Sequence, residues 1–365
     1  MKQINRFYDE RETMFSRERL KPSSKAYQAF YQAHPHLKSG DDKVRGMDFT
    51  KALRLETQRK KTLLTYMEEA DKSIQSYHKR CEQANLSQQK TALDETSVKR
   101  FLTKLGAKDI GIVKLNDKHY YSHHGGNSDI LNLDNYGQKI KKRFKTAIVY
   151  LLPMDVDYIK RAPHAEVLFE SKRIYKNIAK IGMELVLYLK KHGHDALLQS
   201  EAYYLTPLVP LAYDAGLGEI GMPNHIVHPV YGNRLRLNAV LTDLPLVNDS
   251  PIDYGLDTLC KQCGLCLINC PNQSIKHKKR YVNDRVFYQF DEQSCFKMFK
   301  TSGTDCAICI QSCPLSYNLS KSFLNDVKND RKKVDDLIKN HIDTHGRRPK
   351  NKTPLNFEES RDDHD

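Results

Sequence analysis

The sequence predicts an α/β fold that is followed by a cysteine-rich module. Three observations lead to this prediction. Candidate helices and strands alternate between residues 96 and 250, as is typical of an α/β core. Eight of the nine cysteines lie between residues 260 and 313. The first 95 residues are polar and helical in pattern, with few apolar residues for a core of their own.

Residues 1–95 are predicted to form a helical arm that wraps around the rest of the chain. Residues 47–70 carry apolar side chains at uneven helical spacing between charged ones. Such a pattern buries too little apolar surface to offset the entropy of folding alone. Cys81 is the cysteine outside the module, and we interpret it as an incidental thiol in a polar helix.

The α/β core is predicted over residues 96–250. Three apolar, β-branched runs have the length of strands: residues 109–115, 146–152 and 235–241. Two segments have a helical pattern, residues 97–105 and 171–192. Each ends at a glycine, Gly106 or Gly193, the residue that most often closes a helix. After the cysteines, residues 321–365 are predicted to form a charged helix and a tail.

Composition restricts the class of protein. A chain of 365 residues, 39% of them hydrophobic and 28% charged, is expected to be soluble and to hold two or three domains. No apolar run approaches the roughly 18 residues of a membrane span. Residues 1–12 lack the apolar segment of a secretory signal and the twin arginine of an export signal, so a cytoplasmic location is predicted.

The formal charge of +14 leaves nucleic-acid binding open as an alternative. The lysines are spread along most of the chain, and the densest basic stretches are residues 139–145 and 345–352. A dispersed excess of charge is weaker evidence for such binding than a clustered face. It is equally typical of a soluble, lysine-rich surface.

The cysteine spacing indicates two [4Fe–4S] clusters. The first motif, C-x2-C-x2-C-x3-C-P, contains Cys260, Cys263, Cys266 and Cys270. The second begins at Cys295 and continues through Cys306, Cys309 and Cys313 to a proline. In two-cluster ferredoxins the cysteine before the proline binds the other cluster. This wiring assigns one cluster to Cys260, Cys263, Cys266 and Cys313, and the other to Cys270, Cys295, Cys306 and Cys309.

A pair of zinc sites is the alternative for these cysteines. Zinc favours paired CxxC knuckles with longer gaps, and two CxxxCP endings fit clusters better. The module alone would relay electrons at low potential. The long segment in front of it suggests a second redox centre and a substrate pocket.

A glycine-rich segment precedes the cysteines. Residues 215–221 read AGLGEIG, with Gly216, Gly218 and Gly221, and glycine density of this kind permits tight turns or a close approach to a bound group. The segment is not a dinucleotide fingerprint.

Together, DAGLGEIG, YGNRLRL, TDLPL, the first cysteine motif and GTDCAICIQSCP resemble the reductive dehalogenases. These are similar in turn to the epoxyqueuosine reductases. The resemblance covers residues 100–317 well and the first 100 loosely.

This resemblance implies a nitroreductase-like, cobalamin-binding domain over residues 96–250 and a ferredoxin-like domain with two [4Fe–4S] clusters over residues 251–320. Cobalamin would be bound base-off, near Gly216, Gly218 and Gly221. Reduced ferredoxin or flavodoxin would donate electrons, and the substrate would be a small organic molecule.

The resemblance also implies a tyrosine proton donor and, about sixty residues later, a cationic partner. Tyr175 and Arg236 have this separation. Core packing is the alternative role for Tyr175, a surface position is the alternative for Arg236, and Arg234 is its nearest rival. Glu201, near Tyr203 and Tyr204, is the acidic candidate if the enzyme is an epoxyqueuosine reductase.

The function predicted from these residues is a cytoplasmic, cobalamin-dependent reductive dehalogenase. The alternatives are an epoxyqueuosine reductase acting on tRNA, which would give the positive charge a purpose, and a non-catalytic iron–sulfur electron carrier.

Overall fold

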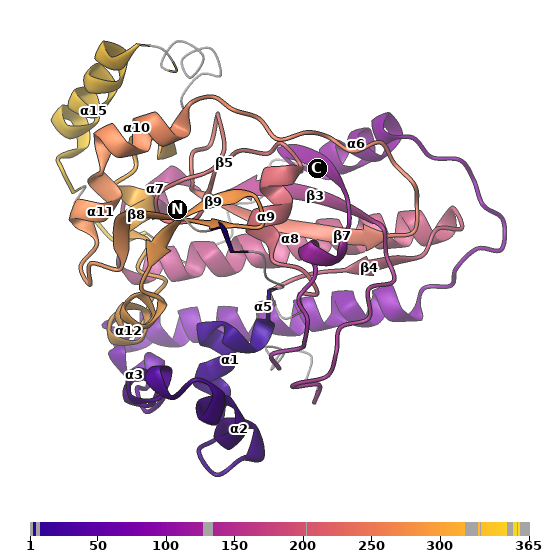
Figure 1. Cartoon of the computed structure of the whole chain (residues 1–365), viewed down its shortest axis with the longest axis horizontal. Coiled ribbons are helices and arrows are strands. Elements are labelled where there is room, and N and C mark those ends of the chain that lie inside the picture. The colour runs from indigo at the N-terminus through magenta and orange to yellow at the C-terminus, as the bar shows by residue number, and fades with distance from the viewer. Residues whose placement is uncertain are drawn as a thin grey trace.

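The structure is a computed structural model that describes residues 3–4, 8–126, 134–201, 203–317, 328, 330–348, 353–355 and 357. A layer of strands lies between helices, and the cysteine-rich module lies at one end of this core (Figure 1). The predicted mixed α/β fold is confirmed.

The central sheet has the strand order β2-β3-β7-β4. Its strands are β2 (Asp109–Lys114), β3 (Thr146–Pro153), β7 (Leu235–Thr242) and β4 (Ala196–Leu198). Each neighbouring pair is antiparallel. The three predicted strands are therefore confirmed to within a residue at either end, and the short strand β4 was not predicted.

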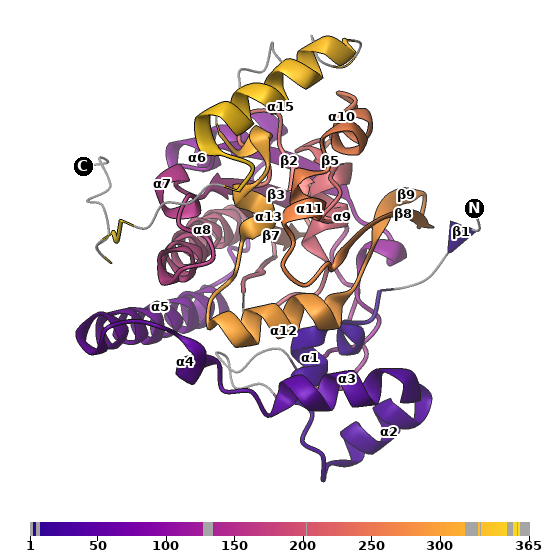
Figure 2. The same cartoon turned by 90° about the vertical axis from the view of Figure 1, so that its left-hand side faces the viewer.

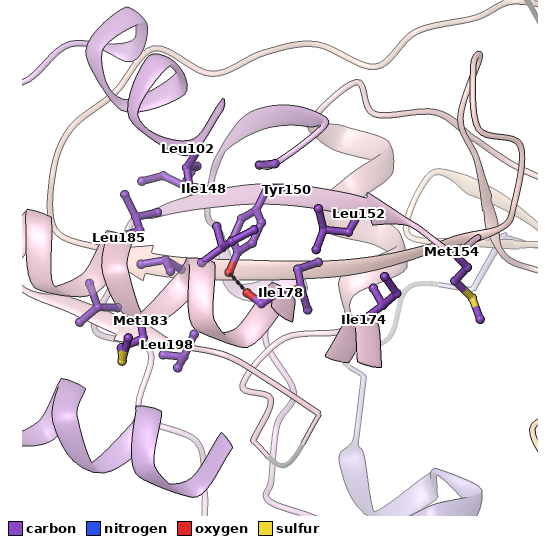
Figure 3. Close-up of a cluster of buried hydrophobic side chains, with 14 of the residues drawn as sticks. Leu102, Ile148, Tyr150, Leu152, Met154, Ile174, Ile178, Met183, Leu185 and Leu198 are labelled. Carbon is purple, nitrogen blue, oxygen red and sulfur yellow. Dashed lines mark hydrogen bonds between the residues drawn. The ribbon is translucent and has the colours of Figure 1, made fainter. Parts of the chain in front are cut away.

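The two faces of β3 are buried by different helices, because side chains alternate along a strand. Ile148, Tyr150 and Leu152 pack in one cluster with residues of the long helix α8 (Ala165–Lys191). Figure 3 shows this cluster, in which the Tyr150 hydroxyl donates to the carbonyl of Ile178 at 3.1 Å. Val149 and Leu151, which alternate with these residues along β3, pack on the opposite face with helix α9 (Leu208–Asp214). A strand buried on both faces explains the continuous apolar run in the sequence.

Helix α8 begins six residues before the predicted start. Residues 165–170 are buried on all sides of the helix, and the helix ends at His192 and Gly193 as predicted. Helix α6 (Glu95–Lys104) also ends where predicted, at Gly106 with φ +99°. The shorter elements near the core are η2 (Asp117–His119), α7 (Val156–Ile159), β5 (Glu219–Ile220) and β6 (Ile226–Val227).

The N-terminal arm is mostly helical, as predicted. Its long helix α5 (Thr57–Gln83) runs beside α8 (Figure 1). Its short elements are β1 (Gln3–Ile4), η1 (Glu10–Glu12), α1 (Met14–Arg19), α2 (Lys25–Ala33), α3 (Pro35–Arg45) and α4 (Phe49–Ala52). Helices α1, α3 and α4 pack against helix α12 (Glu292–Ser302) of the cysteine module (Figure 2). The arm therefore contacts both the α/β core and the module.

The cysteine module is built from short helices around a hairpin. Its elements are α10 (Leu256–Cys263), α11 (Leu265–Asn269), β8 (Ile275–Val282), β9 (Arg285–Phe290), α12 (Glu292–Ser302), α13 (Ile308–Gln311) and η3 (Pro314–Ser316). The charged C-terminal helix, α15 (Arg331–His345), packs on α10. Within the described ranges, no helix combines the length and apolar character that a membrane crossing requires.

Candidate functional site

Tyr175 and Arg236 lie together between α8 and the sheet. Arg236 pairs in register with Leu152 of β3, and directly opposite residues of an antiparallel pair share a face. Leu152 packs on the α8 side of the sheet, so Arg236 is also directed towards α8. Its guanidinium lies 4.8 Å from the centroid of the Tyr175 ring. This distance is typical of a cation–π contact.

Two further residues hold the Arg236 guanidinium in place. Its Nη2 donates to the Oδ2 of Asp305 at 2.9 Å and to the hydroxyl of Ser171. Ser171 is one helical turn before Tyr175 and so lies on the same face of α8. Asp305 immediately precedes Cys306, so the arginine links the sheet to a cysteine loop.

A polar atom of this site is buried without a hydrogen bond among the described residues. It is the Nε of Arg236. An unpaired buried polar group is costly. This atom therefore indicates a place where a bound group can supply a polar contact.

Burial is the largest influence on the pKa of Tyr175 and raises it. The positive charge of Arg236 opposes this rise, while Glu201 adds to it. The phenol therefore keeps its proton near neutral pH, and the nearby charge of Arg236 favours the phenolate form.

A buried lysine joins Glu201 to the arm. The Nζ of Lys172 lies 2.8 Å from the Oε2 of Glu201 and 2.5 Å from the Oδ1 of Asp71 on α5. Burial alone lowers the pKa of Lys172, but the two carboxylates raise it above its ordinary value. Burial also raises the pKa of Glu201, and Lys172 opposes that rise. The N-terminal arm thus contributes a charge to the site.

Tyr204 and His225 complete the group. The pKa of Tyr204 is raised well above its ordinary value by burial and then by Tyr175 and Glu201. Burial and the Arg236 charge lower the pKa of His225 to about 4, so its imidazole is neutral near pH 7. The short sequence motifs did not single out Ser171, Lys172, Asp305 or His225. Asp305 could have been noticed as the aspartate of GTDC.

Arg234, the rival of Arg236, is used elsewhere. It precedes the first residue of β7, is buried, and donates to the carbonyls of Ser316 and Met154. Tyr203 lies outside the Tyr175 group and faces His78 and His124. Cys81 packs in the core beside α8, and burial raises the pKa of its thiol to about 12.

The eight module cysteines are free thiols, and their mutual electrostatic effects sort them into two sets. Burial raises the pKa of Cys313, and the thiols of Cys263 and Cys260 raise it further. The pKa of Cys266 is raised first by burial and then by Cys313, Cys260 and Cys309, so this thiol is also close to the second set. Cys313 therefore lies with the first motif, although it closes the second.

The same kind of electrostatic effect identifies the members of the second set. After burial, Cys306, Cys295 and Cys270 are the thiols that raise the pKa of Cys309. Cys270 thus lies with the second motif. Apolar residues surround both sets, among them Met222, Val227, Leu259, Ile275 and Tyr288. Among the described residues, no three His, Cys, Asp or Glu side chains are arranged to hold a single metal ion.

The three glycines of AGLGEIG allow close packing within the chain. A Cβ on Gly216, which has φ +71°, would lie 2.5 Å from the carbonyl oxygen of Ser250. One on Gly218 would lie 2.3 Å from the carbonyl oxygen of Val227, and one on Gly221 would crowd the Val227 side chain. These contacts already require glycine. A role for the three residues in cobalamin binding stays a prediction.

Replacing Lys172 with methionine should lower the stability of the fold, because it leaves Asp71 and Glu201 as unpaired carboxylates. We expect a loss of about 2 kcal/mol in the free energy of unfolding, less than for a fully buried pair, since the Asp71 and Glu201 side chains are 37% and 30% exposed. Denaturant titration measures the change. Lys72→Met is the control, because Lys72 and Glu68 form an exposed pair on α5 that should contribute little. Equal losses in the two variants would contradict the proposed network.

Comparison with known proteins identifies relatives. No protein-family model matches the chain. The tetrachloroethene reductive dehalogenase of Dehalobacter restrictus is 29% identical over 195 residues, which cover 50% of this chain and 35% of that protein. The enzyme of the same description from Sulfurospirillum multivorans is 26% identical over 180 residues, 47% of this chain and 36% of the relative. The chain is a relative of the reductive dehalogenases.

Solved structures agree with this relationship at the level of the fold. A catabolic reductive dehalogenase superposes with a TM-score of 0.69 at 19% identity, over 94% of this chain and 47% of the other. Another, solved to address B12-dependent dehalogenation, gives a TM-score of 0.65 at 22% identity, over 75% of this chain and 41% of the other.

An epoxyqueuosine reductase of Lactococcus garvieae is a more limited match, 28% identical over 128 residues, 33% of this chain and 35% of that protein. The chain spans about a third of the length of the curated dehalogenases it matches, 35% in the first case.

Proposed function

We propose that this reductive dehalogenase relative is a cobalamin-dependent reductase that carries two [4Fe–4S] clusters and removes a halide from a small organic molecule. The reaction R–X + 2 e⁻ + H⁺ → R–H + X⁻ requires an electron supply, a proton donor and stabilisation of negative charge. Reduced ferredoxin or flavodoxin would supply the electrons.

The observation that carries the proposal is the placement of Tyr175 and Arg236 beside a cysteine loop. The pair shares one face of α8 and the sheet, and Asp305 connects it to Cys306. The proposed proton donor, a cation and the cysteine module that would carry electrons are thus adjacent. The relatives named as dehalogenases give this arrangement its chemical interpretation.

Each residue of the site has a proposed task. Tyr175 would donate the proton from its hydroxyl to the carbon that loses the halide. Arg236 would stabilise the negative charge that develops on the phenolate. Asp305 and Ser171 would hold the guanidinium beside the ring.

The two halves of the chain would divide the cofactors between them. Residues 96–250 would form a nitroreductase-like, cobalamin-binding domain, with the turn containing Gly216, Gly218 and Gly221 as one wall of the corrinoid site. Bound cobalamin would supply the reductive cleavage of the carbon–halogen bond. Residues 251–320 would form the ferredoxin-like domain, and two sets of four thiols in apolar surroundings suit two cubane clusters.

Anaerobic purification followed by metal analysis tests the cofactor assignment. Reconstituted protein should contain about eight irons and eight sulfides per chain, as two cubanes require. Added cobalamin should remain bound through gel filtration with the visible spectrum of the base-off form. Halide release from an organohalide, with reduced ferredoxin as the donor, then tests the activity.

Several outcomes would contradict the proposal. Tight zinc binding without iron would remove the clusters. Clusters without retained corrinoid would favour the electron-carrier alternative. Restored queuosine in a cell that lacks its own epoxyqueuosine reductase would move the function to tRNA.

The tRNA alternative has one structural observation in its favour. Glu201, the acidic candidate for that chemistry, lies close enough to Tyr175 to influence its pKa. The match to an epoxyqueuosine reductase covers 33% of this chain, whereas the matched dehalogenase covers 50%. We therefore favour the dehalogenase.

A further inference from the structure

The described part of the basic stretch 345–352 folds over the second cysteine set. The Nδ2 of Asn269, at the end of α11, donates to the carbonyl of Arg347 at 2.7 Å. Arg348 follows directly, and its charge is within electrostatic reach of Cys306. The basic stretch noticed in the sequence now has a position in the fold.

Cationic side chains surround the same place on the surface. Lys276 and Lys278 are exposed on β8, the strand that follows the turn after Cys270. Neither these lysines nor Arg347 and Arg348 form an ion pair with a described residue. Two carboxylates lie nearby: Asp291 is within electrostatic reach of Lys276, and Glu292 pairs with Arg17. Four cations therefore face two carboxylates, one of them already paired, so positive charge is in excess.

An exposed apolar side chain and an accessible thiol lie in the same part of the module, although Asp291 and Glu292 add negative charge beside that thiol. Ile268 is 65% exposed, although it is a large hydrophobic residue two positions before Cys270. Cys295 is the exposed member of the eight cysteines. Electron transfer needs a short path between redox centres, and the second set offers the cysteine nearest to solvent.

We infer that Ile268, Lys276, Lys278, Arg347 and Arg348 form the docking surface for an acidic ferredoxin, which passes one electron at a time to the cluster of Cys270, Cys295, Cys306 and Cys309. This inference rests on the proposed function. Complementary charge steers such encounters and orients the partners. Each encounter oxidises one reduced ferredoxin and reduces the cluster by one electron, so two encounters supply one turnover.

The test compares two variants with the same change in charge. Arg347→Glu/Arg348→Glu alters the docking surface, and Lys139→Glu/Lys141→Glu alters exposed lysines of the other basic stretch. Binding of an acidic ferredoxin to the reconstituted chain is measured by titration calorimetry at several salt concentrations. We expect the arginine variant to bind about tenfold more weakly and the lysine variant to bind as the unmodified chain does.

A kinetic measurement separates docking from cluster assembly. Stopped-flow reduction by photoreduced ferredoxin should slow in the arginine variant, while reduction by dithionite, which needs no docking surface, should be unchanged. Ile268→Asp should give the same pattern. Iron and sulfide content, measured in parallel, reports whether the clusters are present, so their loss is distinguished from failed docking.

Three results would overturn the inference. Equal weakening by the two charge variants would show a diffuse effect of net charge. Unchanged ferredoxin binding by Arg347→Glu/Arg348→Glu would exclude this surface. A loss of binding to tRNA or to anionic lipid vesicles, with ferredoxin binding intact, would assign the surface to a different partner.

Discussion

Tyr175→Phe should lower the rate of reductive dehalogenation by a factor on the order of 10²–10⁴, because it removes the proton donor. The phenylalanine ring keeps the contact with Arg236, so both clusters and the cobalamin spectrum should be unchanged. Steady-state halide release measures the rate, and the visible spectrum reports the cofactors. The effect should appear in kcat, since the proton is transferred in the chemical step.

Tyr188→Phe is a matched control for this substitution. Tyr188 is half-buried on the same helix, and its ring stacks on Phe101 at 4.2 Å, outside the site. Removing the Tyr188 hydroxyl should leave the rate of dehalogenation unchanged. Arg236→Ala should impair turnover as well, because the phenolate would lose its cationic neighbour. Full activity in Tyr175→Phe would reject Tyr175 as the donor while leaving the family relationship intact.

Pairs of cysteine substitutions should show that the two clusters share the two motifs. Cys270→Ser/Cys306→Ser removes two ligands of one predicted cluster, so about four irons should remain per chain. Cys260→Ser/Cys270→Ser removes one ligand from each cluster, so the iron content should fall well below that of the first variant. Iron and sulfide analysis after anaerobic reconstitution measures both.

Reversed iron contents in the two cysteine pairs would contradict the crossed assignment. If each motif held its own cluster, Cys260 and Cys270 would serve the same cubane and Cys306 would serve the other. Cys81→Ser should leave the full content unchanged, because Cys81 is buried in the α/β core and belongs to neither predicted set. These comparisons need no dehalogenase activity.

The sequence alone determined the features that depend on local pattern. Apolar runs predicted β2, β3 and β7 to within a residue because a strand buried on both faces needs a continuous apolar run. Gly106 and Gly193 marked helix ends because few other residues adopt positive φ. The two CxxxCP endings predict two crossed sets of thiols by the pattern of two-cluster ferredoxins, an assignment that the cysteine pairs above test.

Only the tertiary structure decided the features that depend on long-range pairing. Alternating helices and strands are compatible with several topologies, and the antiparallel order β2-β3-β7-β4 depends on contacts between distant segments. Register between β3 and β7 directs Arg236 towards α8, whereas Arg234 is anchored to carbonyls. Asp71 reaches the site because α5 packs beside α8. No local pattern encodes these approaches, because each one is fixed by how whole elements pack.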